Sequence, residues 1–79
     1  MIAIIDYRAG NLTSVRLAFE AIGVKAEITD SPDVIRRAER VVFPGVGAAG
    51  SAMNTLRSLG LVDVIREVVG RGTPFLGIC

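Results

Sequence analysis

Residues 1–6 read Met1-Ile2-Ala3-Ile4-Ile5-Asp6, an apolar run that continues without a break until it meets an aspartate. A strand with one face in water alternates apolar and polar side chains, whereas a strand of a parallel sheet is covered on both faces and is apolar throughout. The run therefore predicts a strand of a parallel sheet, and Asp6 marks the turn that follows it.

Three more strand-like runs follow, at residues 24–29, 41–43 and 75–78. Apolar residues between them recur at helical spacing, which predicts one helix after each of the first two strands and two helices after the third. Alternation of strands and helices predicts an α/β fold, an open and mostly parallel sheet with helices on both faces. The helical stripes are Leu12, Val15, Phe19 and Ile22; then Val34, Ile35 and Ala38; then Met53, Leu56 and Leu59; and finally Val62, Ile65, Val68 and Val69.

Capping residues support these helix boundaries. Asn11 is a favourable N-cap for the first helix, and Gly23 is suited to the position just after its end. Ser31 followed by Pro32 predicts the start of the second helix, with a capping hydroxyl and proline at the first helical position. Gly60 is expected to close the third helix, and Gly70 or Gly72 the fourth.

The composition limits the class of protein. The 79 residues make at most one small domain, yet 51% are hydrophobic and the mean hydropathy is +0.52, more than such a domain needs. We therefore expect residues 1–79 to be the amino-terminal part of one larger domain. A net charge of +1 without a basic stripe argues against nucleic acid. No membrane span or signal peptide is recognised, and the single cysteine can form no internal disulfide, so a cytoplasmic location is expected.

Ligands of open parallel sheets bind at the carboxyl ends of the strands. Three segments are expected at that edge, namely residues 6–11, Pro44-Gly45-Val46-Gly47, and Cys79. The first could simply end a strand and cap a helix. The second could be a plain turn, or its backbone N–H groups could stabilise an oxyanion.

Cys79 lies at the end of the last apolar run, where a nucleophile of an α/β enzyme would stand. A cysteine in that place is more commonly a buried and inert side chain. Reactivity needs a lowered thiol pKa, which the N-terminus of a following helix would supply. Gly77-Ile78-Cys79 is half of the Gly-x-Cys-x-Gly signature of such a turn, and the chain contains no histidine that could activate the thiol.

Together, these segments resemble the class I (triad-type) glutamine amidotransferases, and most closely the glutaminase subunits of imidazole glycerol phosphate synthases of histidine biosynthesis. The resemblance covers all 79 residues. It lies in Asp6-Tyr7 with Gly10-Asn11-Leu12 and Ser14-Val15, in Pro44-Gly45-Val46-Gly47, and in Gly77-Ile78-Cys79. It implies a flavodoxin-like sheet. Ala48-Ala49-Gly50 departs from the family, in which many members have an aromatic residue after the segment that corresponds to Pro44-Gly45-Val46-Gly47.

The resemblance also implies an activity. Cys79 would attack the side-chain amide of glutamine, and ammonia would pass to a (β/α)8-barrel cyclase subunit that makes imidazole glycerol phosphate and the aminoimidazole ribonucleotide AICAR. Gly45, Val46 and Gly47 would form the oxyanion and substrate-binding segment, and Gly10 and Asn11 would face the cyclase. The triad histidine and glutamate of the family would lie after Cys79. The resemblance implies no metal and no organic cofactor.

Two alternatives remain at this point. A DJ-1/PfpI-type cysteine hydrolase shares the fold and the nucleophile turn, and Asp6 could supply its acidic residue, although Pro44-Gly45-Val46-Gly47 fits the amidotransferases better. A phosphoacceptor receiver domain is disfavoured because Phe43-Pro44 stands where its aspartate would be. Residues 1–79 alone, lacking histidine, are expected to be an inactive fragment.

Overall fold

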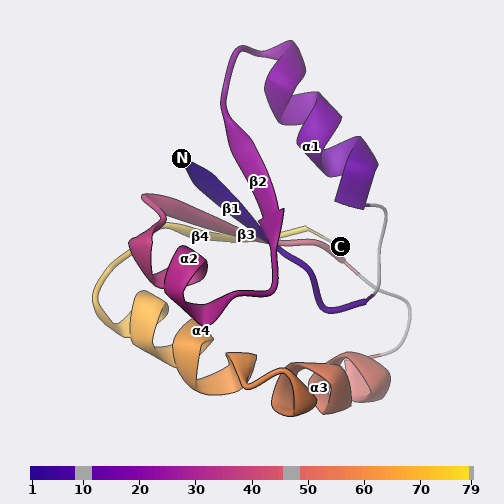
Figure 1. Ribbon diagram of the computed structural model, residues 1–79, viewed down its shortest axis with the longest axis vertical. Coiled ribbons are helices and arrows are strands. Elements are labelled where there is room, and N and C mark those ends of the chain that lie inside the picture. Colours follow the sequence, from indigo (N-terminus) through magenta and orange to yellow (C-terminus); the bar gives the residue numbers. More distant parts are fainter. Residues whose placement is uncertain (9–11, 46–48, 79) are drawn as a thin grey trace.

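The computed structural model contains a four-stranded sheet flanked by helices (Figure 1). It describes residues 1–8, 12–45 and 49–78. The elements follow the predicted order, including two consecutive helices before the last strand. They are β1 (Ile2–Ile5), α1 (Leu12–Ala21), β2 (Ala26–Thr29), α2 (Pro32–Arg37), β3 (Arg40–Phe43), α3 (Ala49–Ser58), α4 (Leu61–Gly70) and β4 (Phe75–Gly77).

The strands lie side by side in the order β2-β1-β3-β4, and each pairing is parallel. β1 is central, because Ile2 pairs with Ala26 of β2 on one side and with Arg40 of β3 on the other. Ala3, Ile4 and Ile5 are all 0% exposed. The prediction that this strand is covered on both faces is therefore confirmed.

Alternate side chains of β1 enter two separate cores. Ile2 and Ile4 pack with Val42 against Leu12, Val15 and Phe19 of α1, on one face of the sheet. Ile22, which was predicted to belong to the same stripe, lies just after α1 and is 72% exposed. Ala3 and Ile5 join the larger core on the other face, which α2, α3 and α4 cover. The α-helical residues buried in that larger core are Ile35, Leu56, Leu61, Val64 and Val68.

The predicted boundaries hold within a few residues. Ser31 caps α2, since its hydroxyl accepts a hydrogen bond from the N–H of Val34 at 3.5 Å, and Pro32 is the first helical residue. Gly23 adopts a left-handed φ of 77° after α1, a conformation that suits glycine. Asn11, the predicted N-cap of α1, lies outside the described residues. α3 begins at Ala49, before the first residue of its apolar stripe, because the apolar pattern marks only the packed part of a helix.

β4 leaves apolar surface at one side of the sheet. It pairs with β3, and no further strand pairs with its other edge within residues 1–8, 12–45 and 49–78. Leu76 is 54% exposed and Ile78 37%. The excess of apolar residues noted in the sequence is thus visible as uncovered side chains beside β4. None of the helices in the described ranges has the length and apolar character needed to cross a membrane.

Two neighbouring valines of α4 provide a matched test of the core. Val68 is 0% exposed and packs in the larger core, whereas Val69 is 51% exposed. We expect Val68→Ala to lower the free energy of unfolding by about 2 kcal/mol, from two lost methyl groups and the cavity that they leave. Val69→Ala should change it by less than about 0.5 kcal/mol. Urea denaturation of the full-length protein would measure both, and equal effects would contradict this assignment of the core face.

Candidate functional site

The candidate site lies at the carboxyl edge of the sheet. Because the strands are parallel, the residues that follow all four of them emerge at the same edge (Figure 1). Asp6 follows β1, Asp30 follows β2, Pro44 follows β3 and Ile78 follows β4. The N–H of Asp6 donates to the carbonyl of Thr29 at 2.9 Å, so the pairing of β1 with β2 continues to this edge.

Of the predicted site residues, the structure describes Gly45, which is half-buried directly after Pro44. Gly10, Asn11, Val46, Gly47 and Cys79 lie outside the described residues. Their roles stay predictions, although the residues that precede them are placed. The structure thus gives the framework from which the predicted site continues.

The ends of β3 and β4 come together at this framework. The N–H of Ile78 donates to the carbonyl of Phe43 at 2.9 Å, one step beyond the paired residues Phe43 and Gly77. Ile78 directly precedes Cys79, and Phe43 directly precedes Pro44-Gly45. The two segments predicted to carry the nucleophile and the oxyanion donors therefore start from adjacent, hydrogen-bonded backbone positions.

Tyr7 links β1 to the same place. Its side chain is 1% exposed, and its ring stacks on Phe43 with the ring centroids 4.5 Å apart and the planes inclined by 18°. The Tyr7 hydroxyl donates a hydrogen bond to the carbonyl oxygen of Pro44. The tyrosine thus contacts both residues that lead into Gly45.

Arg8 ties together the ends of β1 and β2. Its guanidinium contacts a carboxylate oxygen of Asp6 at 3.0 Å and one of Asp30 at 2.8 Å. The hydrogen bond that the Arg8 guanidinium donates to Asp30, together with the charge of Asp6, raises the pKa of Arg8. The Arg8 side chain is 53% exposed, so water screens both ion pairs and they contribute little to stability. Arg8 also has a φ of 67°, in the left-handed region that favours glycine.

Sequence reasoning named Tyr7 only as part of a family motif and assigned Arg8 no role. A signal for Tyr7 was present, because the chain's single tyrosine directly follows a strand and its Asp6. A tyrosine buried there needs a partner for its hydroxyl. The partner itself could not be inferred, since it is a backbone carbonyl far along the chain. For Arg8, the signal was an aspartate directly after each of the first two predicted strands, Asp6 and Asp30.

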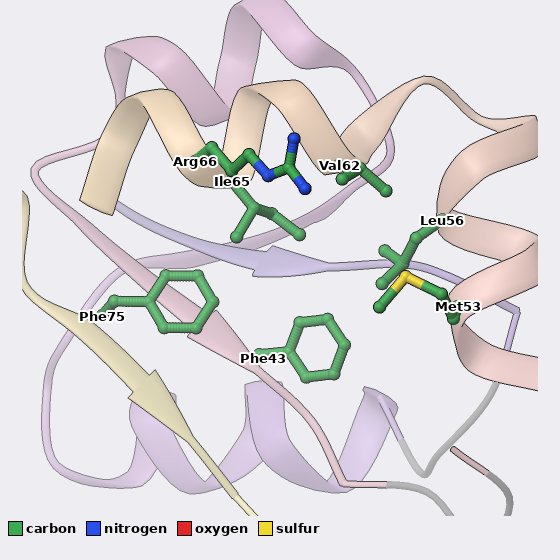
Figure 2. Close-up of a pocket in the computed structure, with 7 residues that line it drawn as sticks. All are labelled: Phe43, Met53, Leu56, Val62, Ile65, Arg66 and Phe75. Atoms are coloured by element: carbon green, nitrogen blue, oxygen red, sulfur yellow. The ribbon is translucent and has the colours of Figure 1, made fainter. Parts of the chain in front are cut away.

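An apolar groove of about 380 Å³ lies between strands β3 and β4 and helices α3 and α4. Figure 2 shows the rings of Phe43 and Phe75 on the strands facing side chains from the two helices. Arg66 is the one charged residue of its lining. The groove offers packing surface and few polar groups, so it is not suited to hold a polar amino acid. The lining residues are Phe43, Met53, Leu56, Val62, Ile65, Arg66 and Phe75.

Within the described ranges, histidine, cysteine, aspartate and glutamate side chains form no group of three or more that could hold a metal ion. The described acidic side chains at the carboxyl edge, Asp6 and Asp30, are engaged with Arg8. At this part of the edge, the buried Tyr7 hydroxyl bonds the Pro44 carbonyl and so acts on the backbone that leads into Gly45.

Comparison with known proteins shows that the chain is similar to subunits of imidazole glycerol phosphate synthases. The chain is 56% identical over 79 residues to the imidazole glycerol phosphate synthase subunit HisH of Nitratidesulfovibrio vulgaris, a match that covers 100% of the chain and 37% of that protein. The chain is a homologue of HisH. The HisH subunit of Moorella thermoacetica is 54% identical over 78 residues, and that of Chloroflexus aurantiacus 51% over 79 residues. No protein-family model matches the chain.

The chain spans about 37% of the length of these HisH relatives. A solved structure described as a glutamine amidotransferase superposes on the whole chain with a TM-score of 0.82, at 19% identity and over 42% of that structure's chain. This likeness confirms the fold class. The HisH homology confirms the family resemblance predicted from the sequence, and it favours the amidotransferases over the DJ-1/PfpI-type hydrolases.

The left-handed backbone at Arg8 can be tested with two substitutions. Arg8→Ala and Arg8→Gly both remove the ion pairs to Asp6 and Asp30, so their difference reports the backbone conformation alone. We expect the glycine variant to unfold with a free energy about 1 kcal/mol higher than the alanine variant, because glycine adopts positive φ without a steric penalty. Denaturant titration of the two full-length variants measures the difference. A glycine variant no more stable than the alanine variant would contradict the backbone conformation described for Arg8.

Proposed function

We propose that residues 1–79 form the amino-terminal part of a single glutamine amidotransferase domain, and that the whole protein is the glutaminase subunit of an imidazole glycerol phosphate synthase. The observation that carries this proposal is 56% identity to a HisH subunit along the entire chain. The adjacent ends of β3 and β4 support it, because they bring the segments before Gly45 and Cys79 to one edge of the sheet.

In this proposal Cys79 is the nucleophile. Its thiolate attacks the side-chain carboxamide carbon of glutamine, and the carbonyl oxygen becomes an oxyanion in the tetrahedral intermediate. Collapse of the intermediate breaks the C–N bond and releases ammonia once the nitrogen has been protonated. The remaining glutamyl thioester reacts with water to give glutamate and to restore the thiol.

The other roles are divided between this chain and its continuation. Backbone N–H groups of Gly45, Val46 and Gly47 would stabilise the oxyanion and hold the substrate. The 79 residues contain no histidine, so the imidazole that moves protons would come from another part of the polypeptide, together with its glutamate. We assign no metal or organic cofactor to this half-reaction.

The ammonia released from glutamine needs a partner enzyme that uses it. We propose that the subunit forms a cytoplasmic heterodimer with a (β/α)8-barrel cyclase, which uses the ammonia in the lyase reaction that yields imidazole glycerol phosphate and AICAR. Gly10 and Asn11, which lie between β1 and α1 in the sequence, would face that cyclase. Transfer inside the complex would keep ammonia from being lost to solvent as ammonium.

The nucleophile can be tested in the full-length protein assembled with its cyclase. Cys79→Ala and Cys79→Ser should abolish glutamine-dependent synthesis and leave synthesis from added ammonium unchanged, because the cyclase does not depend on the thiol. Product formation with each nitrogen source is the measurement. Loss of both activities together would indicate a structural cysteine, and retention of both would exclude Cys79 as the nucleophile.

The oxyanion segment can be tested by adding a methyl group to its glycines. Gly45→Ala and Gly47→Ala should each lower kcat for glutamine hydrolysis by about 100-fold, because restricted backbone dihedrals misalign the N–H donors. Gly70→Ala is a matched control within helix α4, where an added Cβ meets nothing within 4 Å. It should stabilise the protein by up to about 1 kcal/mol and leave kcat unchanged. Wild-type rates for both Gly45→Ala and Gly47→Ala would remove the assignment.

A further inference from the structure

Tyr7 differs from the polar residues beside it at the carboxyl edge. The side chains of Asp6 and Arg8 are 27% and 53% exposed, whereas Tyr7 is 1% exposed. Burying a hydroxyl costs free energy unless it finds a hydrogen-bond partner. The Tyr7 hydroxyl donates its hydrogen bond to the carbonyl oxygen of Pro44, a residue that directly follows β3 and belongs to no strand. The tyrosine thus reaches beyond the sheet to the first peptide of the loop after β3.

The bonded carbonyl shares a peptide unit with the N–H of Gly45. A trans peptide is planar, and its C=O and N–H point in opposite directions. No peptide bond in the described part of the chain is cis. Holding the Pro44 carbonyl toward Tyr7 therefore also fixes the direction of the Gly45 N–H.

The contacts of Tyr7 make it a rigid support for this peptide. The Tyr7 ring is stacked on the ring of Phe43. The centroid of the Phe43 ring in turn lies 6.3 Å from the centroid of the Phe75 ring on β4. The proline ring locks the φ of Pro44, which limits the direction in which the chain leaves β3. The peptide that joins Pro44 to Gly45 can still turn about the ψ of Pro44 and the φ of Gly45, and the hydrogen bond from Tyr7 to its carbonyl opposes that turn.

We propose that Tyr7 is a positioning residue for glutamine hydrolysis, acting through its hydrogen bond to the Pro44 carbonyl. The bond sets the direction of the Gly45 N–H, the first of the backbone donors proposed for the oxyanion. This inference rests on the proposed glutaminase function and adds to it a residue from a different strand. Tyr7 acts through Pro44 and is assigned no contact with glutamine.

Tyr7→Phe removes the hydroxyl and keeps the ring that stacks on Phe43. In the full-length protein assembled with its cyclase, we expect kcat for glutamine hydrolysis to fall by about 10-fold to 100-fold, as for other misplacements of catalytic groups. The KM for glutamine should change by less than about twofold, because the oxyanion interaction is stronger in the transition state than in the bound substrate. Synthesis from added ammonium should be unchanged.

Two further measurements separate positioning from a general structural role. Alkylation of Cys79 by iodoacetamide, followed by peptide mass spectrometry, needs an accessible thiolate and no oxyanion donor, so Tyr7→Phe should leave its rate unchanged. Thr73→Val is the matched control, since it deletes a hydroxyl that bonds Arg71 at the opposite edge of the sheet, before β4. It should leave kcat at the wild-type value.

The outcomes distinguish this inference from the function on which it rests. A wild-type kcat for Tyr7→Phe, with Cys79→Ala inactive toward glutamine, would overturn the role of Tyr7 and leave the glutaminase intact. Parallel losses of glutamine hydrolysis, Cys79 alkylation and ammonium-dependent synthesis would show that Tyr7 is merely structural. Glutamine hydrolysis by Cys79→Ala would overturn the proposed function and this inference together.

Discussion

The structure depends on the burial of β1 between two parallel neighbours. Its backbone is hydrogen-bonded on both edges, and Ala3, Ile4 and Ile5 have no exposed surface on either face. Such a strand cannot shift its register without turning every apolar side chain toward the wrong core. The positions of α1 on one face and of the other three helices on the opposite face follow from this constraint.

The same constraint gives the carboxyl edge its precision. Residues that leave a fixed central strand can hold the loops on both sides of it. Arg8 does so toward β2 through Asp30, and Tyr7 does so toward β3 through Pro44. The two contacts differ in their effect. The exposed ion pair of Arg8 with Asp30 contributes little to stability. The buried hydroxyl of Tyr7 holds the Pro44 carbonyl in place, because breaking a hydrogen bond of a buried polar group costs free energy. The segment that follows β3 is thus supported from the most buried strand of the sheet.

The fold could be predicted from the sequence because its evidence is local. The apolar run at 2–5, the helical stripe of Leu12, Val15 and Phe19, and the Ser31-Pro32 cap each identify an element within a few residues. The order of the strands, and the contact of Tyr7 with Pro44, depend on pairings between distant segments and could not be read from spacing. The site was predicted from a family motif, and of its residues the structure describes Gly45. The left-handed conformation of Arg8 had no signal, since arginine has no preference for it.

The strand order β2-β1-β3-β4 also has a consequence for synthesis on the ribosome. The central strand leaves first, with both hydrogen-bonding edges open, and receives β2 on one side. β3 is then added on the other side of β1, and β4 is added beside β3. Unpaired edges promote association between chains. On the side where β3 and β4 are added, each new strand covers the edge that was open before it, whereas no strand of the described residues covers the outer edge of β2.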